Sequence, residues 1–248
     1  PRARLMHGKS IPESPAIRLW DLPVRLVHWS FVALLPALWW SAETGRLDLH
    51  QTLGLVMLAL VAFRLLWGAV GSETARFSAF LRGPRAVMGY VKGLRGGGHA
   101  PAAGHNPLGG WSVLTLLGLL AVQVTLGLFA QDTDAVGSGP LNHRVSWDTA
   151  EALTEAHELG FNLILAFVAL HLAAIFYYRV IRRDDLVRPM LTGRRTFPAG
   201  TAEPRMAPLW RAGVCAAVAA ALAWWLSFGA PLPGEEPLQD SPAAAEGM

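Results

Sequence analysis

The sequence predicts an all-α integral membrane protein with five transmembrane helices. Of its 248 residues, 52% are hydrophobic and 16% are charged, and the apolar residues are gathered in long blocks. A helix needs about 20 apolar residues to cross the ~30 Å hydrocarbon core of a membrane. Five blocks have roughly this length: residues 22–41, 49–70, 108–130, 159–181 and 209–228.

The first apolar block is expected to be a membrane helix and not a cleaved signal peptide. It is longer than the roughly 7–15 residues of a signal-peptide core. It also contains Arg25 and His28, and no small-residue cleavage site follows it. Residues 1–17, which precede it, are rich in proline and basic residues without periodicity, and this composition predicts a flexible arm.

Basic residues mark one side of the membrane. They precede the first helix, fill the segment between the second and third, and follow the fourth: Arg2, Arg4, Lys9, Arg18, Arg25, Arg76, Arg82, Arg85, Lys92, Arg95, Arg179, Arg182, Arg183, Arg188, Arg194, Arg195 and Arg205. The positive-inside rule places these regions in the cytoplasm, so the N-terminus is expected to be cytoplasmic and the C-terminus to lie outside.

The opposite side is predicted to be acidic. Its loops contain only two basic residues, Arg46 and Arg144, against the acidic residues Glu43, Asp48, Asp132, Asp134, Asp148 and Glu151. The formal net charge of +3 and the pI near 9.5 conceal this division. The basic pI therefore does not indicate a nucleic-acid partner.

Two of the connecting segments have a recognisable pattern. Residues 71–107 alternate apolar with basic side chains, which predicts a short helix in the membrane interface, followed by a glycine hinge at 96–98. Residues 131–154 form a polar loop, in which Ser146 and Thr149 are candidate caps for helical structure that leads into the fourth apolar block.

Four histidines lie within or at the ends of the apolar blocks: His28, His50, His157 and His171. Ionisable side chains at membrane depth are rare and usually functional. The helix directions place His28 and His171 near the cytoplasmic side, and His50 and His157 near the outer side. The histidines thus form two depth-matched pairs, which the competing interpretation of simple interhelical hydrogen bonds leaves unexplained.

The spacing on the fourth helix places both of its histidines on one face. Fourteen residues separate His157 from His171, which corresponds to a rise of about 21 Å and an angular offset of about 40°. Two b-type haems with bis-histidine ligation satisfy this arrangement. The one cysteine, Cys215, excludes an internal disulfide and a Cys-x-x-Cys-His attachment site, so any haem is held non-covalently.

Three further residues are candidates for the same sites. Arg25 lies one turn before His28, and Arg64 lies on the face of His50 near the inner level, where a guanidinium suits a haem propionate. Gly54, one turn after His50, leaves room for a porphyrin. The alternatives are that Arg25 anchors at the headgroups, that Arg64 snorkels to the surface, and that Gly54 is an ordinary packing glycine.

Other polar and small residues have weaker signals. Gly160, one turn after His157, is a second candidate position for the approach of a porphyrin to the backbone, and the alternative is again an ordinary packing glycine. Gln123 and Thr125, in the third helix, are expected to form interhelical hydrogen bonds. Three other histidines lie in loops and are expected to be solvated: His7, His99 and His143.

Four short segments and two histidines form a specific pattern. The segments are residues 18–29 (RLWDLPVRLVHW), 49–54 (LHQTLG), 63–68 (FRLLWG) and 104–109 (GHNPLG), and the histidines are His157 and His171. Together they cover roughly residues 17–195. The pattern resembles the bacterial di-haem cytochrome b561 and nickel-iron hydrogenase cytochrome b subunit family.

The resemblance implies a four-helix core with two b haems in the bacterial inner membrane, which moves electrons between quinone and an outer redox partner. The implied haem ligands are His28, His50, His157 and His171. In related formate dehydrogenase cytochrome b subunits a quinone site lies beside the inner haem. Similarity makes His105, Asn106 and Gly109 candidates to line such a site. The alternative is that residues 104–109 only form the turn into the third helix.

The expected function is that of an electron-transfer subunit between the quinone pool and a periplasmic c-type cytochrome or hydrogenase. The acidic outer surface favours a basic partner. One alternative is a superoxide:quinone oxidoreductase that acts on its own, which the acidic surface disfavours because it repels an anion. A histidine-based metal transporter is less favoured, because such sites lie near the midplane, and a passive anchor leaves the histidines unexplained.

The chain is therefore expected to contain five parts. They are a cytoplasmic arm (1–17), a four-helix cytochrome b domain (18–195), a cytoplasmic linker (196–208), an extra transmembrane helix (209–228) and an acidic periplasmic tail (229–248). The extra helix and the tail fall outside the family pattern. The fifth helix is a candidate for holding the partner.

Overall fold

Five helices dominate the computed structural model of the chain, which describes residues 16–95, 104–131, 137–198 and 200–231. They are α1 (Leu22–Glu43), α2 (Leu47–Val70), α5 (Pro107–Phe129), α6 (Trp147–Val180) and α8 (Leu209–Ser227). All five are long and apolar enough to cross a membrane. The predicted all-α class and its five spans are thus confirmed.

The remaining elements are short and lie at the ends of the spanning helices. They are α3 (Phe77–Phe80), α4 (Pro84–Arg95), η1 (Asn142–Arg144), α7 (Val187–Thr192), β1 (Ala16–Arg18) and β2 (Arg194–Thr196). Helix α4 is the short helix that the sequence predicts within residues 71–107, and it contacts α5. The glycine hinge predicted at 96–98 lies outside the described residues.

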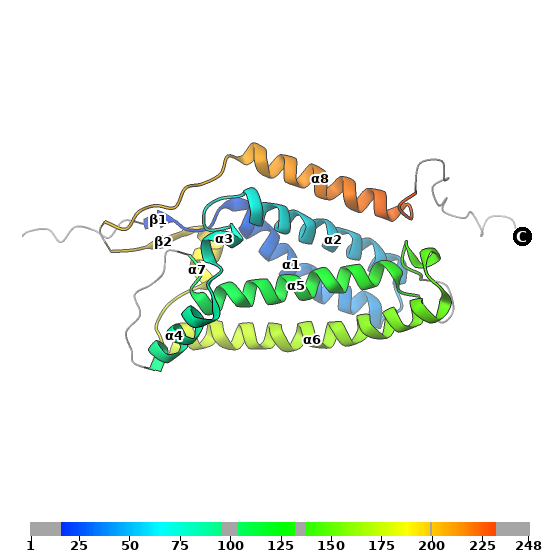
Figure 1. Cartoon of the computed structure of the whole chain (residues 1–248), viewed down its shortest axis with the longest axis horizontal. Helices are drawn as coiled ribbons and strands as arrows, with labels where there is room; N and C mark the ends of the chain where they lie inside the picture. The colour runs from blue at the N-terminus through cyan, green and yellow to red at the C-terminus, as the bar shows by residue number, and fades with distance from the viewer. Residues whose placement is uncertain (1–15, 96–103, 132–136, 199, 232–248) are drawn as a thin grey trace, which may run out of the picture.

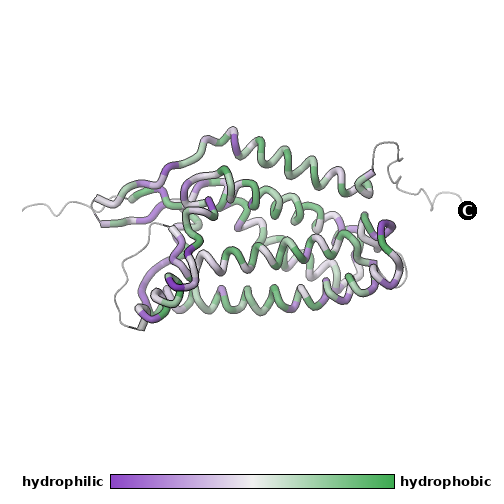
Figure 2. The backbone as a smooth tube through the Cα atoms, in the orientation of Figure 1, coloured by the Kyte–Doolittle hydropathy of each residue, from purple (hydrophilic) through white to green (hydrophobic). Residues whose placement is uncertain are grey.

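The spanning helices lie side by side, with α2 in the middle (Figure 1). Helix α2 packs against α1, α5 and α8, whereas α6 packs mainly against α5. Apolar residues cover the helices along their length, and polar residues are most frequent near their ends (Figure 2). The end where α1 begins and α6 ends is called the basic end below, and the opposite end is called the acidic end.

Three spanning helices begin at side-chain caps that the sequence provides. The Asp21 carboxylate accepts the Val24 N–H at 2.8 Å at the start of α1, and Asn106 Oδ1 accepts the Gly109 N–H at 2.7 Å at the start of α5. Ser146 caps α6 by accepting the Thr149 N–H at 3.4 Å, as its position in the sequence predicts. Such caps satisfy backbone N–H groups that have no partner within the helix.

Helix α6 is longer than the sequence predicts. It starts at Trp147, whereas the fourth apolar block starts at residue 159, and it contains 34 residues. At 1.5 Å per residue its length is about 51 Å, more than the ~30 Å of a hydrocarbon core. The polar first turns of α6 therefore extend beyond the membrane at the acidic end.

A two-stranded ladder at the basic end joins the segment that precedes α1 to the segment that follows α6 and α7. Strand β1 pairs antiparallel with β2, with Ala16 opposite Thr196 and Arg18 opposite Arg194. Ala16 and Ile17, which are predicted from the sequence to belong to the flexible arm, are paired in this ladder. Hydrophobic periodicity gave no signal for strands only three residues long.

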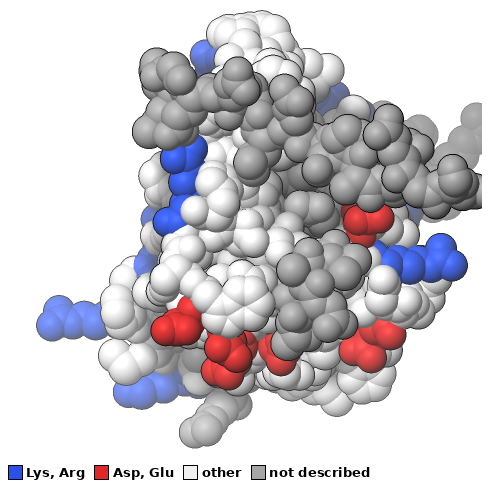
Figure 3. Space-filling model, turned by 90° about the vertical axis from the view of Figure 1, so that its right-hand side faces the viewer, with Lys and Arg blue, Asp and Glu red and all other residues white. Residues whose placement is uncertain are grey.

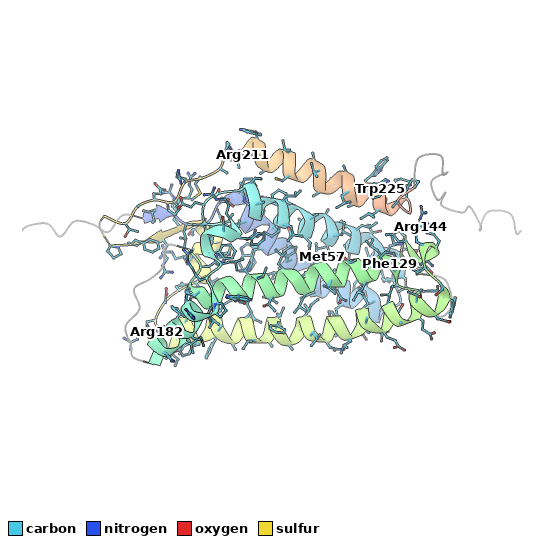
Figure 4. All side chains as sticks on the ribbon, viewed as in Figure 1. Met57, Phe129, Arg144, Arg182, Arg211 and Trp225 are labelled. Atoms are coloured by element: carbon cyan, nitrogen blue, oxygen red, sulfur yellow. The ribbon has the colours of Figure 1, made fainter. Side chains whose placement is uncertain are left out.

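Helix α8 lies along α2 and is attached at both ends (Figure 1). Its buried residues Cys215, Ala219 and Ala223 are small and four residues apart, so they form one narrow stripe. At the basic end, Arg205 forms an ion pair with Glu73 (Nε to Oε2, 3.6 Å). At the acidic end, Arg144 donates hydrogen bonds to two carbonyl groups just beyond α8, 3.3 and 3.2 Å away (Figure 4).

The acidic end carries a group of exposed carboxylates (Figure 3). They lie at the end of α1, the start of α2 and the first turns of α6: Glu43, Asp48, Asp148, Glu151, Glu155 and Glu158. Arg46 and Arg144 are exposed at the same end. The predicted charge difference between the two ends is therefore present in the described part of the chain.

Candidate functional site

The two histidines at the acidic end face each other across the bundle. His50 lies in the first turn of α2, and His157 lies further along α6. Their ring centroids are 6.3 Å apart, with an interplanar angle of 82°. A metal–imidazole bond is about 2.0–2.1 Å long and the ring centre lies roughly 1 Å further on, so two imidazoles on opposite sides of one metal have centres about 6 Å apart. The observed separation fits one iron between the rings.

Hydrogen bonds to backbone carbonyls orient both of these rings. His50 Nδ1 lies 2.9 Å from the Leu38 carbonyl oxygen, and His157 Nδ1 lies 3.0 Å from the Gln123 carbonyl oxygen. Because a carbonyl oxygen only accepts, each Nδ1 carries the proton and each Nε2 has its lone pair available for a metal. Metal-ligating histidines are usually fixed in this way.

Small residues leave space beside these rings. A Cβ added to Gly127 would lie 2.9 Å from His157 Cε1, so α5 needs a glycine at this position. A Cβ added to Gly54 would meet no atom within 4 Å, so the space beside this turn of α2 is open, as a nearby porphyrin requires. Gly160 fits the close-packing interpretation, because its missing side chain makes room for the Gln123 amide.

Gln123 and Thr125, both in α5, form different hydrogen bonds. Gln123 Nε2 donates to the His157 carbonyl oxygen at 2.9 Å, which is the interhelical bond that the sequence predicts. The corresponding expectation for Thr125 is wrong, since its hydroxyl donates to the Ala121 carbonyl oxygen within the same helix, 2.7 Å away. A threonine hydroxyl reaches back four residues in its own helix without help from a neighbour.

The histidines of the predicted pair at the basic end are less constrained than those at the acidic end. His28 lies on α1 and His171 on α6, and both are nearer the basic end of their helices. His28 Nδ1 is buried without a hydrogen-bond partner among the described residues, and the His28 and Trp29 ring centroids are 5.2 Å apart. No hydrogen bond within the described part of the chain fixes either ring, and the pairing of these two histidines on one haem stays a prediction.

The two candidate arginines have different surroundings. Arg25 donates from Nε to the Met190 carbonyl oxygen at 3.3 Å and from Nη2 to the Leu191 carbonyl oxygen, both in α7. Its contacts in the structure are therefore with backbone, and its pairing with a propionate stays a prediction. Arg64 does not snorkel to the surface: it is 6% exposed, and its guanidinium lies over the Phe77 ring, 5.1 Å from the ring centroid.

His105 is buried in an aromatic environment at the start of α5. Its ring lies 4.5 Å from the Trp20 ring and 4.4 Å from the Phe80 ring, measured between centroids. Burial, and then the nearby charge of Arg64, lower the pKa of His105 to about 3. This histidine is therefore neutral at physiological pH.

Asn106 and Gly109 form the turn into α5, as the alternative interpretation of residues 104–109 expects. Besides capping the helix, Asn106 donates from Nδ2 to the Tyr178 hydroxyl at 3.1 Å. That hydroxyl also shares a 2.7 Å hydrogen bond with the hydroxyl of Tyr90 on α4. Burial and the Tyr178 hydroxyl raise the pKa of Tyr90 above its ordinary value.

Sequence reasoning overlooked Tyr90, Tyr178 and the Asp21–Trp67 contact. Tyr178 lies seven residues after His171, so both occupy the same face of α6, and this spacing was an available signal. Trp67 Nε1 donates to Asp21 Oδ2 at 2.9 Å and thereby joins the end of α2 to the start of α1. No local pattern marks this second contact, because its partners are 46 residues apart.

A membrane helix bundle with opposed, carbonyl-bonded histidine rings is the arrangement of a membrane b-type cytochrome. The comparison of the chain with family models gives the particular family. The model of the prokaryotic cytochrome b561 family matches residues 19–193, and the chain belongs to this family.

Several relatives support this assignment. The chain is 22% identical over 225 residues to the probable Ni/Fe-hydrogenase B-type cytochrome subunit of Rhizobium leguminosarum bv. viciae, covering 77% of this chain and 93% of that protein. It is 22% identical over 222 residues to the protein of the same name from Bradyrhizobium diazoefficiens, covering 77% and 90%. The Rhodobacter capsulatus protein of this name is 24% identical over 222 residues, covering 76% and 85%. No solved structure matches the chain significantly.

The family defines the general role of the chain. It is a multi-pass membrane protein that binds haem b and takes part in transmembrane electron transfer. The family match ends at residue 193, before α8 begins at Leu209. Helix α8 thus lies outside the matched residues.

Proposed function

We propose that the chain carries two b haems and transfers electrons between quinone at the basic end and a redox protein at the acidic end. In this proposal His28 and His171 ligate one haem, and His50 and His157 ligate the other. The observation that supports it most strongly is the 6.3 Å separation of the His50 and His157 rings. The open space beside Gly54 is consistent with the same site.

A bound haem supplies one-electron redox chemistry, and the protein supplies ligands, orientation and polarity. The Leu38 and Gln123 carbonyls keep the two Nε2 atoms at the acidic end directed at a metal. On α6 the two histidines differ in depth by about 21 Å, a distance that two extended porphyrins shorten to a range suitable for electron tunnelling.

Quinone exchange is proposed at the basic end, near His171. Asn106, Tyr90 and Tyr178 offer partly buried polar groups between α4, α5 and α6, on the face of α6 that carries His171. Gly109 belongs to the same turn. His105, the other candidate from the sequence, lies deeper, since it is enclosed by Trp20 and Phe80.

The proposed orientation of the chain in the membrane is inferred from the distribution of basic and acidic residues between its two ends. The basic end faces the cytoplasm of a bacterial inner membrane, and the acidic end faces the periplasm. The exposed carboxylates of the acidic end favour a basic docking surface on the partner and oppose superoxide as a substrate. A hydrogenase partner is supported by the names of the relatives, and a c-type cytochrome fits the charge equally well.

The haem proposal is tested by a reduced-minus-oxidised absorbance spectrum and by haem quantification on the purified full-length chain. We expect two b haems per chain. His50→Ala and His157→Ala should remove the same haem, and His28→Ala and His171→Ala the other. His143→Ala, at an exposed position in η1, is the control and should retain both. One haem per wild-type chain, or crossed losses, would contradict the proposal.

The partner is tested by co-purification from native membranes, followed by identification of the bound protein. A hydrogenase or a c-type cytochrome supports the proposed role. The neutralising variant Glu151→Gln with Glu155→Gln should weaken the association at low salt, because both carboxylates are exposed at the acidic end. A complex unaffected by this change and by salt would argue against charge-based docking.

A further inference from the structure

A buried arginine at the basic end lacks the partners that such a residue normally needs. Arg64 is 6% exposed, and its Nη1 atom is buried without a hydrogen-bond partner among the described residues. A buried cation costs free energy unless it is paired and hydrogen-bonded. The contact with the Phe77 ring offers a cation–π attraction but no acceptor for this N–H.

Asp21 does not supply the missing acceptor. Its Oδ1 accepts the Val24 N–H at 2.8 Å, and its Oδ2 accepts the Trp67 Nε1–H at 2.9 Å. Asp21 attracts Arg64 only from a longer distance, since no ion pair of Arg64 occurs in the described part of the chain. The carboxylate that would satisfy Arg64 is therefore not one of the described side chains.

His105 is a second donor with an unsatisfied nitrogen in the same surroundings. Its Nδ1 is buried without a partner among the described residues. Its ring packs against Phe80, Phe80 packs against Phe77, and the Arg64 guanidinium lies over the Phe77 ring. A neutral imidazole donates one hydrogen bond. A cation and a neutral donor, both unpaired, thus lie near each other at the start of α5.

Both donors lie at the level of the histidine pair at the basic end. Arg64 follows Phe63 and His28 follows Val27, and the side chains of Phe63 and Val27 belong to one buried cluster between α1 and α2. Arg64 also continues the face of α2 formed by His50, Met57 and Val61. Met57, labelled in Figure 4, and Val61 belong to a buried cluster with Leu117 of α5. Arg64 therefore lies at a depth similar to that of His28.

We propose that Arg64 and His105 bind a carboxylate of the group held by His28 and His171. On the proposed function, on which this inference rests, that carboxylate is a haem propionate. The guanidinium presents a planar fork that matches the two carboxylate oxygens, and the imidazole N–H supplies a further donor. This assigns His105 to the haem at the basic end and leaves the quinone to the Tyr178 region.

The test measures the midpoint potentials of the two haems separately, together with haem content. Removing a positive charge beside a haem disfavours its reduced form, so Arg64→Gln should lower the potential of the basic-end haem or release that haem. The acidic-end haem should keep its potential and its spectrum. Arg64→Lys should restore the haem with an intermediate potential, because it keeps the charge but loses the fork.

Arg211→Gln is the matched control, because it removes an exposed arginine from the basic end of α8 and should change neither potential (Figure 4). If Arg64→Gln does not accumulate as a folded protein, His105→Phe replaces it. That variant keeps an aromatic ring between Trp20 and Phe80 but removes both ring nitrogens and with them the N–H donor, so the basic-end potential should fall.

Unchanged potentials and haem content in Arg64→Gln, or in His105→Phe when that variant is used, would overturn the inference. An equal shift at both haems would also overturn it, because it indicates a general loss of packing. Failure of the proposed function itself appears differently, as fewer than two haems in the wild-type chain.

Discussion

The two ends of the bundle hold their histidines in different ways. At the acidic end, carbonyl groups of α1 and α5 accept the Nδ1–H of His50 and His157. At the basic end, His28 Nδ1, Arg64 Nη1 and His105 Nδ1 are all buried without partners among the described residues. Buried polar groups in proteins are normally hydrogen-bonded, so this concentration of exceptions needs an explanation.

The difference indicates how each site is organised. The acidic end is preorganised, because main-chain atoms set the ring orientations before any ligand arrives. The basic end contains donors that a ligand must satisfy, and its final arrangement therefore depends on the bound group. A preorganised site loses less conformational entropy on binding. The following predictions test this contrast, from the largest expected effect to the smallest.

The acidic-end site should not tolerate a side chain at Gly127. In Gly127→Val the new Cβ would lie 2.9 Å from His157 Cε1, and the branched methyl groups add to the overlap. The His157 ring must then leave its position, so we expect the loss of about half of the bound haem, all from the acidic end. Haem quantification and the potentials of the remaining haem measure this effect.

Gly213→Val serves as its control, since a Cβ at this position of α8 meets no atom within 4 Å. It should keep both haems. Full haem content in Gly127→Val would show that the His157 ring is not held where the structure places it.

Removal of haem should loosen the basic end more than the acidic end. Protein made in a haem-deficient host loses the ligand's stabilisation of the folded state. Amide hydrogen exchange should then increase most around His28 and residues 104–109, where the buried donors are left unpaired. The start of α2 and the middle of α5 should change less, and equal increases at both ends would remove the proposed contrast.

The side chain of Gln123 should contribute modestly to stability and little to haem binding. Gln123→Leu removes the bond to the His157 carbonyl oxygen but leaves the main-chain carbonyl that orients the ring. Interhelical hydrogen bonds in membrane proteins contribute about 0.6–1 kcal/mol each. Unfolding in mixed micelles measures the change, and Thr125→Val, which affects a bond within α5, should lower stability less.

The smallest expected effect is the loss of the contact between Glu73 and Arg205, which holds the segment before α8 at the basic end. Arg205 lowers the pKa of Glu73 below its ordinary value of 4.5 through a backbone hydrogen bond and its charge. A lowered pKa in the folded state means that the contact contributes stability above pH ~4.5, and that this contribution is lost as the pH falls through the folded-state pKa. Because Glu73 is exposed, the loss is small.

The measurement for Glu73 is the exchange of the Arg205 amide, which donates to Glu73 Oε2 at 3.1 Å. Its protection should decrease on acidification in the wild type. In the Glu73→Gln variant, the protection of the Arg205 amide from hydrogen exchange should be low and nearly independent of pH. A wild type and variant with the same pH profile would show that the carboxylate does not hold this segment.

Sequence reasoning predicted the parts of the structure that depend on local periodicity. The five spans, the Ser146 cap and the interhelical bond of Gln123 are confirmed, since hydrophobic blocks and polar residues within them carry direct signals. The start of α6 was missed, because its first turns are polar and lie beyond the apolar block. The β1–β2 ladder was missed because three-residue strands have no detectable alternation.

The candidate site also has parts that the sequence predicts and parts that it does not. The positions of the histidines on their helices follow from charge asymmetry and helical phase. The partners of Arg25 and the enclosure of His105 depend on α7, α3 and the residues before α1, whose placement is set by contacts between distant parts of the chain. Spacing along a helix predicts which face a residue occupies and cannot predict what approaches that face.

The β1–β2 ladder has a mechanical consequence for the two ligand helices α1 and α6. Strand β1 leads directly into α1, and β2 follows α6 after the short helix α7, so the ladder joins these two helices at the basic end. Because the ladder lies near His28 and His171, a small change in the angle between α1 and α6 would hardly alter the separation of the helices at these residues. The same change would displace the acidic ends of both helices the most. At that end, the rings of His50 and His157 are held by hydrogen bonds to backbone carbonyls.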